Sequence, residues 1–221
     1  MASSKKTPVQ QLTGLAAESL DLAESFVFMP ETVRLAREAA LDTGASVPSN
    51  GACATLTFLA RAIAAKAVVE VGTGRGVTGL ALFAGMADDG VLTSIDVDAD
   101  GQNVARQAFV AAKLAPRRFR LINSIALDVL PKLSDGAYDI VLINGNKLEY
   151  VEYLSQAQRL LRAGGVLIVS DALWNNLVAD PRSEDDAAFI IREALQVVQE
   201  DDDYTSLLIP LGDGILTAVK S

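Results

Sequence analysis

The sequence contains no histidine and only one cysteine, Cys53. Without histidine, the chain cannot build Ser-His-Asp or Cys-His nucleophile systems or an imidazole metal site. Any general base must therefore be a lysine, aspartate, glutamate or tyrosine. A single cysteine excludes an intrachain disulfide and fits a reducing, cytoplasmic setting, which we therefore expect.

Aromatic residues are scarce, at 5% of the 221 residues, whereas apolar residues make up 50%. A sizeable core built mostly from Ala, Val, Leu and Ile is therefore expected. Positive charge is also in deficit, because the formal net charge is −9. We accordingly expect neither nucleic acid nor an anionic membrane as a partner. No apolar run reaches the roughly 18 residues of a membrane-spanning helix, and no apolar segment follows the N-terminus as in a signal peptide.

Residues 1–45 are predicted to form a helical arm ahead of a main domain at residues 46–221. Residues 1 to about 8 are expected to be disordered, and a helix is expected from Val9 to about Glu24. A second helix is expected from Pro30 to Gly44, with the proline in its first turn. The arm either covers an exposed flank of the domain or serves as a lid or a dimer contact.

From Lys66 onward, short apolar runs alternate with helical patterns. Strands are predicted at residues 68–71, 91–96, 119–123, 139–144 and 164–171, and each is followed by a helix. This order implies a parallel sheet with helices on both faces. Two final runs, 204–210 and 215–220, are joined by a short turn and must be antiparallel. The predicted fold class is α/β, a doubly wound, Rossmann-like, mostly parallel sheet of seven strands with a reversed last strand.

The segment AVVEVGTGRGVTG, residues 67–79, combines a buried strand, a glycine turn and the start of a helix. Its spacing is G-x-G-x-G, which differs from the dinucleotide fingerprint G-x-G-x-x-G. Glu70 stands at the end of this strand, and Asp96 ends the next one. A carboxylate at that position can accept both hydroxyls of a ribose. Asp96 is alternatively a helix cap, for which Asp98 is an equally good candidate. Together these residues predict a pocket for an adenosine-bearing ligand.

Six segments extend this pattern into a specific resemblance. They are VVEVGTGRGVTG, VLTSIDVD, SIALDVLPKL, YDIVLINGNKLEY, LLRAGGVLIVSDALW and IPLGDGILTAVK, in this order. From about Val47 to the C-terminus, the chain resembles the S-adenosylmethionine-dependent O-methyltransferases of the caffeoyl-CoA and catechol type. The resemblance implies a methyl transfer to a hydroxyl of a small molecule, and it implies a homodimer.

The resemblance also implies roles for individual residues around S-adenosylmethionine. The methionine end would meet Val47, the ribose Asp96, and the adenine Val97, Ile125 and Ala126. Ile125 stands where the family usually has an aspartate. The full set of implied cofactor contacts is Val47, Glu70, Gly72, Thr73, Gly74, Thr78, Asp96, Val97, Ile125, Ala126, Asn144 and Asn146.

The divalent metal site of the family is altered in this sequence. Two aspartates and an asparagine hold the metal in the family, and the matching positions here are Asn144, Asp171 and Ala172. The family has a further aspartate two residues after the first of these positions, and Asn146 stands there in this sequence. Mg²⁺ prefers several carboxylate oxygens in an octahedron, so one remaining carboxylate makes a poor site. We therefore expect a pocket without a divalent metal.

By the resemblance, Lys147 stands at the position of the lysine that acts as general base in the family. Alternatively, it is a surface lysine paired with Glu149 or Asp171. Asn144, Asp171 and Trp174 are the predicted acceptor contacts, although core packing explains Trp174 equally well.

The function predicted from the sequence is that of an S-adenosylmethionine-dependent O-methyltransferase with a small hydroxylated acceptor. A second hypothesis is a cofactor-binding protein that transfers little or no methyl and acts through interactions. A third is a nicotinamide-dependent oxidoreductase, which would share the sheet and the ribose-binding acid.

Overall fold

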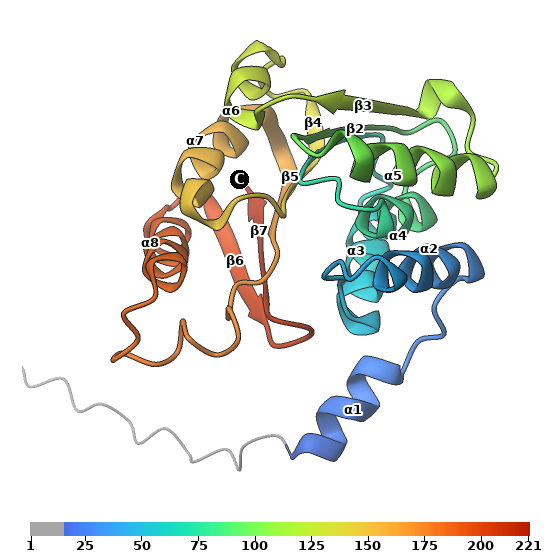
Figure 1. Cartoon of the computed structure of the whole chain (residues 1–221). Coiled ribbons are helices and arrows are strands. Elements are labelled where there is room, and N and C mark those ends of the chain that lie inside the picture. The colour runs from blue at the N-terminus through green and yellow to red at the C-terminus, as the bar shows by residue number, and fades with distance from the viewer. Residues whose placement is uncertain (1–15) are drawn as a thin grey trace, which may run out of the picture.

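The computed structural model describes residues 16–221 of the chain. Its centre is a seven-stranded sheet with the order β3-β2-β1-β4-β5-β7-β6 (Figure 1). Strand β7 is antiparallel to both of its neighbours, whereas the pairs among β1 to β5 are parallel. This topology confirms the predicted fold class. The strands are β1 (Ala67–Val71), β2 (Val91–Asp96), β3 (Phe119–Asn123), β4 (Tyr138–Ile143), β5 (Leu161–Val169), β6 (Tyr204–Ile209) and β7 (Ile215–Lys220).

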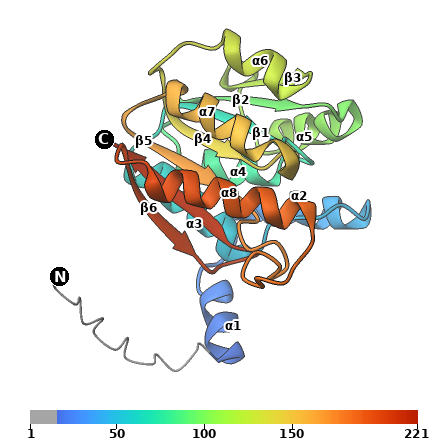
Figure 2. The same cartoon turned by 90° about the vertical axis from the view of Figure 1, so that its left-hand side faces the viewer.

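Helices cover both faces of the sheet (Figures 1 and 2). On one face pack α2 (Glu31–Asp42), α3 (Asn50–Ala62), α4 (Val77–Gly85) and α5 (Ala99–Ala111), and on the other α6 (Ala126–Val129), α7 (Tyr150–Leu160) and α8 (Asp186–Glu200). Successive strand side chains point to opposite faces, so Val68 joins the first core and Val69 the second. Because both faces are covered, the parallel strands are apolar almost throughout.

The sheet changes direction between β1 and β4. From β1 the chain winds outward through β2 to β3, then crosses back to β4 and winds the other way. In open parallel sheets, ligands bind at this switch point, beyond the carboxyl ends of the strands. We therefore expect a ligand to bind at the loops that follow β1, β2, β4 and β5.

The N-terminal helices differ in how they attach to the domain. Helix α1 (Ala17–Ser25) buries no residue, whereas α2 buries Val33, Ala36 and Ala40 against the first core. The predicted start of the first helix at Val9 and the predicted disorder of residues 1–8 lie outside the described residues. The division of the chain at residue 45, and the role of the arm as a lid or dimer contact, stay predictions.

Two boundaries depart from the sequence-based expectation. Strand β5 begins at Leu161 rather than Gly164, with an irregular register between Tyr138 and Ile140 of β4. The helical pattern expected after β3 is reduced to α6 and a 3-10 turn, Leu130–Lys132, that contains Pro131. Proline has no N–H to continue an α-helix. Among residues 16–221, no helix has the length and apolar content needed to cross a membrane.

Candidate functional site

The glycine loop between β1 and α4 has left-handed backbone at alternate positions. Gly72, Gly74 and Gly76 have φ of +94°, +51° and +86°. A Cβ at Gly72 would lie 2.3 Å from the carbonyl oxygen of Asn144, and a Cβ at Gly76 would lie 2.9 Å from Ala105. The loop therefore requires glycine both for its conformation and for its close approach to β4 and α5.

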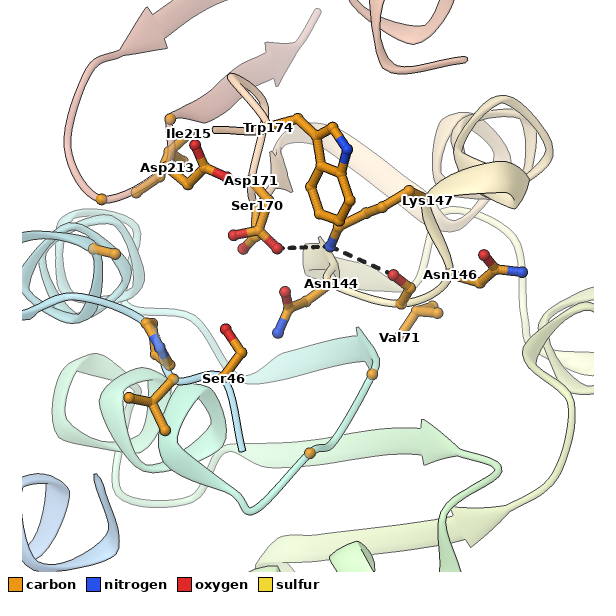
Figure 3. A pocket seen from close by; sticks show the side chains of 18 of the residues that line it. Ser46, Val71, Asn144, Asn146, Lys147, Ser170, Asp171, Trp174, Asp213 and Ile215 are labelled. Carbon is orange, nitrogen blue, oxygen red and sulfur yellow. Dashed lines mark hydrogen bonds and ion pairs between the residues drawn. The ribbon is translucent and has the colours of Figure 1, made fainter. Parts of the chain in front are cut away.

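The carboxyl ends of the strands open into a cavity of about 1350 Å³ (Figure 3). Twelve of the predicted catalytic, cofactor and acceptor residues lie in its wall. They are Val47, Gly72, Gly74, Asp96, Val97, Ile125, Ala126, Asn144, Asn146, Lys147, Asp171 and Trp174. The predicted site residues that do not line it are Glu70, Thr73 and Thr78.

Glu70, Thr73 and Thr78 instead form a buried polar network beneath the loop. The hydroxyls of Thr78 and Ser94 donate to the two carboxylate oxygens of Glu70, and Thr73 bonds to Ser94 at 2.6 Å. Burial raises the pKa of Glu70 to about 7, although the two hydroxyl donors oppose this shift. None of these three residues lines the cavity, and the cofactor contacts predicted for them stay predictions. Glu70 points toward the core that contains α4.

Asp96 presents its carboxylate to the cavity. One oxygen accepts the backbone N–H of Gly74 and the other that of Asp98, both at 2.9 Å. Asp98, not Asp96, caps α5, because its side chain accepts the N–H of Gly101. Each oxygen of Asp96 keeps a second lone pair, so the carboxylate can still accept hydrogen bonds from a ligand.

Beside Asp96, the cavity has an apolar section. Val97 is 68% exposed and Ile125 is 52% exposed, although both side chains are large and apolar. Exposed apolar surface that lines a cavity is suited to cover a flat, apolar ligand face.

Lys147 lies in the 3-10 turn η3 (Lys147–Glu149), which is capped by the side chain of Asn146. Its Nζ is 2.6 Å from Oδ2 of Asp171, and its side chain is only 12% exposed. The same ammonium group lies 5.1 Å from the ring of Tyr150 and 5.6 Å from that of Trp174, within cation–π range. Figure 3 shows Lys147, Asp171 and Trp174 pointing toward one another. Of the two pairings left open by the sequence, the structure has the one with Asp171.

The donors at the position of the family metal do not fit a divalent cation. Asn144 offers a neutral amide, Asp171 already pairs with Lys147, and Ala172 is a fully buried methyl group. Within residues 16–221, no three His, Cys, Asp or Glu side chains gather as a metal-binding group. Mg²⁺ and Ca²⁺ need several oxygen ligands, which these positions do not supply.

The cavity wall also contains residues that sequence reasoning missed, above all Asp213 and Asn175. Asp213 lies in the turn between β6 and β7. Because β7 runs antiparallel to β5, this turn must lie at the same edge as the carboxyl ends of the parallel strands. The predicted reversal of the last strand was thus a signal that could have placed Asp213 at the site.

Comparisons with known proteins agree with this geometry. A curated relative from Mycobacterium marinum, with the provisional name of O-methyltransferase, is 40% identical over 218 residues, or 99% of this chain and 97% of the relative. A crystal structure of a Corynebacterium glutamicum protein is similar with a TM-score of 0.85 and 28% identity, covering 92% of this chain and 96% of that one. The O-methyltransferase TomG from Streptomyces achromogenes shares the fold, with a TM-score of 0.80, 24% identity and coverage of 91% and 95%. The sequence profile described as O-methyltransferase matches residues 24–221, so the chain belongs to the O-methyltransferase family.

Proposed function

We propose that the protein transfers the methyl group of S-adenosylmethionine to a hydroxyl of a small acceptor, without a divalent metal. Membership of the O-methyltransferase family supports the reaction. The Streptomyces achromogenes enzyme, which has the same fold, was crystallised with S-adenosylmethionine. The observation that carries the metal-free part is the ion pair between Lys147 and Asp171, where the family metal would lie.

The cofactor is assigned to the part of the cavity next to the glycine loop. Asp96 would accept the ribose hydroxyls, and the adenine would lie between Val97 and Ile125, above Ala126. The methionine end would reach Val47 and the ends of β1 and β4, at Gly72 and Asn144. All of these residues line one cavity, which supports a single continuous cofactor site. Glu70, Thr73 and Thr78 would act indirectly, by supporting the loop from below.

The acceptor is assigned to the space beside Lys147, Asp171 and Trp174. Bound S-adenosylmethionine would supply the methyl group, which the acceptor oxygen would take as the carbon–sulfur bond breaks. The hydroxyl proton passes to the Lys147–Asp171 pair, which then holds an ammonium and a carboxylic acid. The ammonium of Lys147 stabilises the negative charge that develops on the oxygen. The general-base role predicted for Lys147 alone thus becomes a role of the pair.

The test is a transfer assay with tritiated S-adenosylmethionine and a panel of hydroxylated aromatic acceptors, with Mg²⁺ or with EDTA. We expect product under both conditions and a loss of about 100-fold or more in Lys147→Ala. Lys132→Ala, which removes an exposed lysine in another 3-10 turn, is the matched control. Transfer that requires Mg²⁺ contradicts the metal-free proposal. Tight binding of S-adenosylhomocysteine with no product from any acceptor favours the binding-protein hypothesis.

A homodimer is the assembly that we propose for this enzyme. Phe26 and Phe28, which follow α1, are 78% and 97% exposed, and Phe58 on α3 is 71% exposed. Exposed aromatic side chains of this size are typical of contact surfaces. Sedimentation equilibrium of the full chain tests this proposal, and a monomer at micromolar concentration contradicts it.

A further inference from the structure

Asp213 lies in the short turn between β6 and β7 and contacts the segment that follows β5. Both oxygens of its carboxylate accept the backbone N–H of Asn175, at 2.7 Å and 2.9 Å. Its carbonyl oxygen accepts the N–H of Leu173 at 2.8 Å, and that of Gly214 accepts the N–H of Ala172 at 2.9 Å. The turn therefore holds this segment through both its main chain and one carboxylate.

The segment that the turn holds has an unusual backbone. Asp171 has a φ of +53°, and the consecutive residues Trp174, Asn175 and Asn176 have φ of +45°, +53° and +65°. Left-handed backbone is unfavourable for residues with a Cβ, and a run of three persists only where surrounding contacts impose it. The N–H of the middle residue of this run is the one that Asp213 binds. The carboxylate is therefore placed to stabilise the run directly.

The same segment builds the acceptor end of the cavity. Asp171 begins it and pairs with Lys147, and Trp174 places its ring 5.6 Å from the same ammonium group (Figure 3). A change in the left-handed run would displace Trp174 and Asp171 relative to Lys147. The geometry of the Lys147–Asp171 pair thus depends on Asp213, which makes no hydrogen bond to Lys147.

Charged groups surround Asp213 on several elements. Asp171 follows β5, Lys147 lies in η3, and Glu24 of α1 accepts the N–H of the neighbouring Gly212 at 2.5 Å. Asp185, which caps α8, accepts the indole N–H of Trp174 at 3.0 Å. Burial raises the pKa of Asp213, the charge of Asp171 adds to this shift, and the bonded peptide N–H and Lys147 oppose it.

We propose that Asp213 is a positioning residue of the acceptor site. Its carboxylate fixes the left-handed segment at Asn175 and thereby sets the contact between Lys147 and Asp171. This inference rests on the proposed function, because it concerns the pair to which the proton transfer is assigned.

Trp174 is the only tryptophan in the chain, so its fluorescence reports on this segment without any acceptor. We expect Asp213→Ala to increase the quenching of Trp174 by acrylamide by roughly twofold or more, because the segment opens locally. The affinity for S-adenosylhomocysteine stays unchanged, since Asp96 and the glycine loop lie elsewhere in the wall. Asp88→Asn, which alters an exposed aspartate between α4 and β2, is the control and leaves both quantities unchanged.

A pH titration separates positioning from a general structural role. The Trp174 emission of the unmodified protein changes in the acid range as Asp213 takes up a proton and releases the N–H of Asn175. Asp213→Asn lacks this transition, whereas Asp185→Asn retains it.

Persistence of the transition in Asp213→Asn overturns the inference, and so does unchanged quenching in Asp213→Ala. Should Asp213→Ala not fold, the nearly isosteric Asp213→Asn still decides the matter. If the unmodified protein does not bind S-adenosylhomocysteine, the proposed function fails instead.

Discussion

Glu70 is a fully buried carboxylate that lies directly beneath the glycine loop. Its place at the end of the first strand, next to the glycines, predicts a contact with the cofactor. The alternation of side chains along β1 already points elsewhere, since Glu70 shares a face with Val68 and so turns toward the core with α4. What the sequence could not show is that the hydroxyls of Thr78 and Ser94 would meet both carboxylate oxygens. That contact depends on the distance between two strands and a helix.

The raised pKa of Glu70, from 4.5 to about 7, predicts a pH-dependent stability. Below pH 4.5 the group is protonated in both states. Between pH 4.5 and 7 only the unfolded chain loses the proton, so stability falls by about 3 kcal/mol as the pH rises. We expect Glu70→Gln to remove this slope and to be more stable than the unmodified protein at pH 8. Urea unfolding from pH 4.5 to 8 measures it, with the exposed Glu193→Gln as control. Parallel pH profiles for Glu70→Gln and the unmodified protein would contradict the assignment.

At the scale of elements, two glycines in the turn between β1 and α4 differ in the space that they leave for a Cβ atom. A Cβ at Gly72 would meet backbone atoms of Asn144 at 2.3 Å and 2.6 Å, whereas a Cβ at Gly74 would meet no atom within 4 Å. We expect Gly74→Ala to cost about 1 kcal/mol for its left-handed backbone. Gly72→Ala should cost about 3 kcal/mol, because β4 must move as well. Chemical denaturation of the two variants tests the order, and equal losses would refute it.

Asp139 joins three strands at the edge of the sheet opposite the cavity. Its carboxylate accepts the N–H groups of Lys66 and Ala67 at 2.7 Å and 2.8 Å, and Nε of Arg162 at 2.7 Å. Burial raises its pKa, but these donors lower it more, so that the net pKa lies below the ordinary value of 3.8.

Asp139→Asn should therefore destabilise the fold by about 1.5–3 kcal/mol at neutral pH. Because the folded pKa is depressed, the stabilisation is present above pH 3.8 and disappears as the pH falls through the folded value. The measurement is the difference in urea midpoint between the variant and the unmodified protein at pH 7 and at the lowest pH where both still fold. Binding of S-adenosylhomocysteine is the internal control. Its loss in Asp139→Asn would show that the edge of the sheet with Asp139 and the edge with the cavity are not independent.

The elements themselves were largely readable from the sequence. All seven strands lie where apolar runs were expected, because each run is short and rich in Val, Ile and Leu. The first five are each followed by a helical pattern, and the last two are joined by a short turn. The backbone of the segment after β5, where we propose that the acceptor binds, was not readable in this way. The left-handed conformation of Trp174 to Asn176 involves no glycine, and the N–H of Asn175 within it is bound by Asp213, which the β6–β7 turn supplies from far along the chain. Local preference alone would not predict it.

At the scale of the whole molecule, the cavity draws its wall from nearly every part of the described chain. Segments at residues 24–25, 46–50, 71–72, 95–97, 124–126, 144–147, 170–171 and 211–215 contribute to it. The wall includes members of both cores, Ile215 from the core with α2 to α5 and Ala126 from the core with α6 to α8. A ligand held there contacts elements from both sides of the sheet. Binding should therefore stabilise the domain as one cooperative unit.

This coupling predicts a large shift in melting temperature with S-adenosylhomocysteine. At a ligand concentration about 100 times its Kd, binding adds about 2.7 kcal/mol, or roughly 5–10 °C for a chain of this length. Asp96→Ala, which removes the proposed ribose acceptor, should weaken binding by about 1–3 kcal/mol and cut the shift at the same ligand concentration to between about two thirds and a tenth. Asp88→Asn should keep the full shift, because Asp88 lies away from the cavity wall. Differential scanning calorimetry with S-adenosylhomocysteine and with NAD decides between the cofactors. A shift with NAD alone would restore the oxidoreductase hypothesis, and an undiminished shift in Asp96→Ala would remove Asp96 from the ribose site.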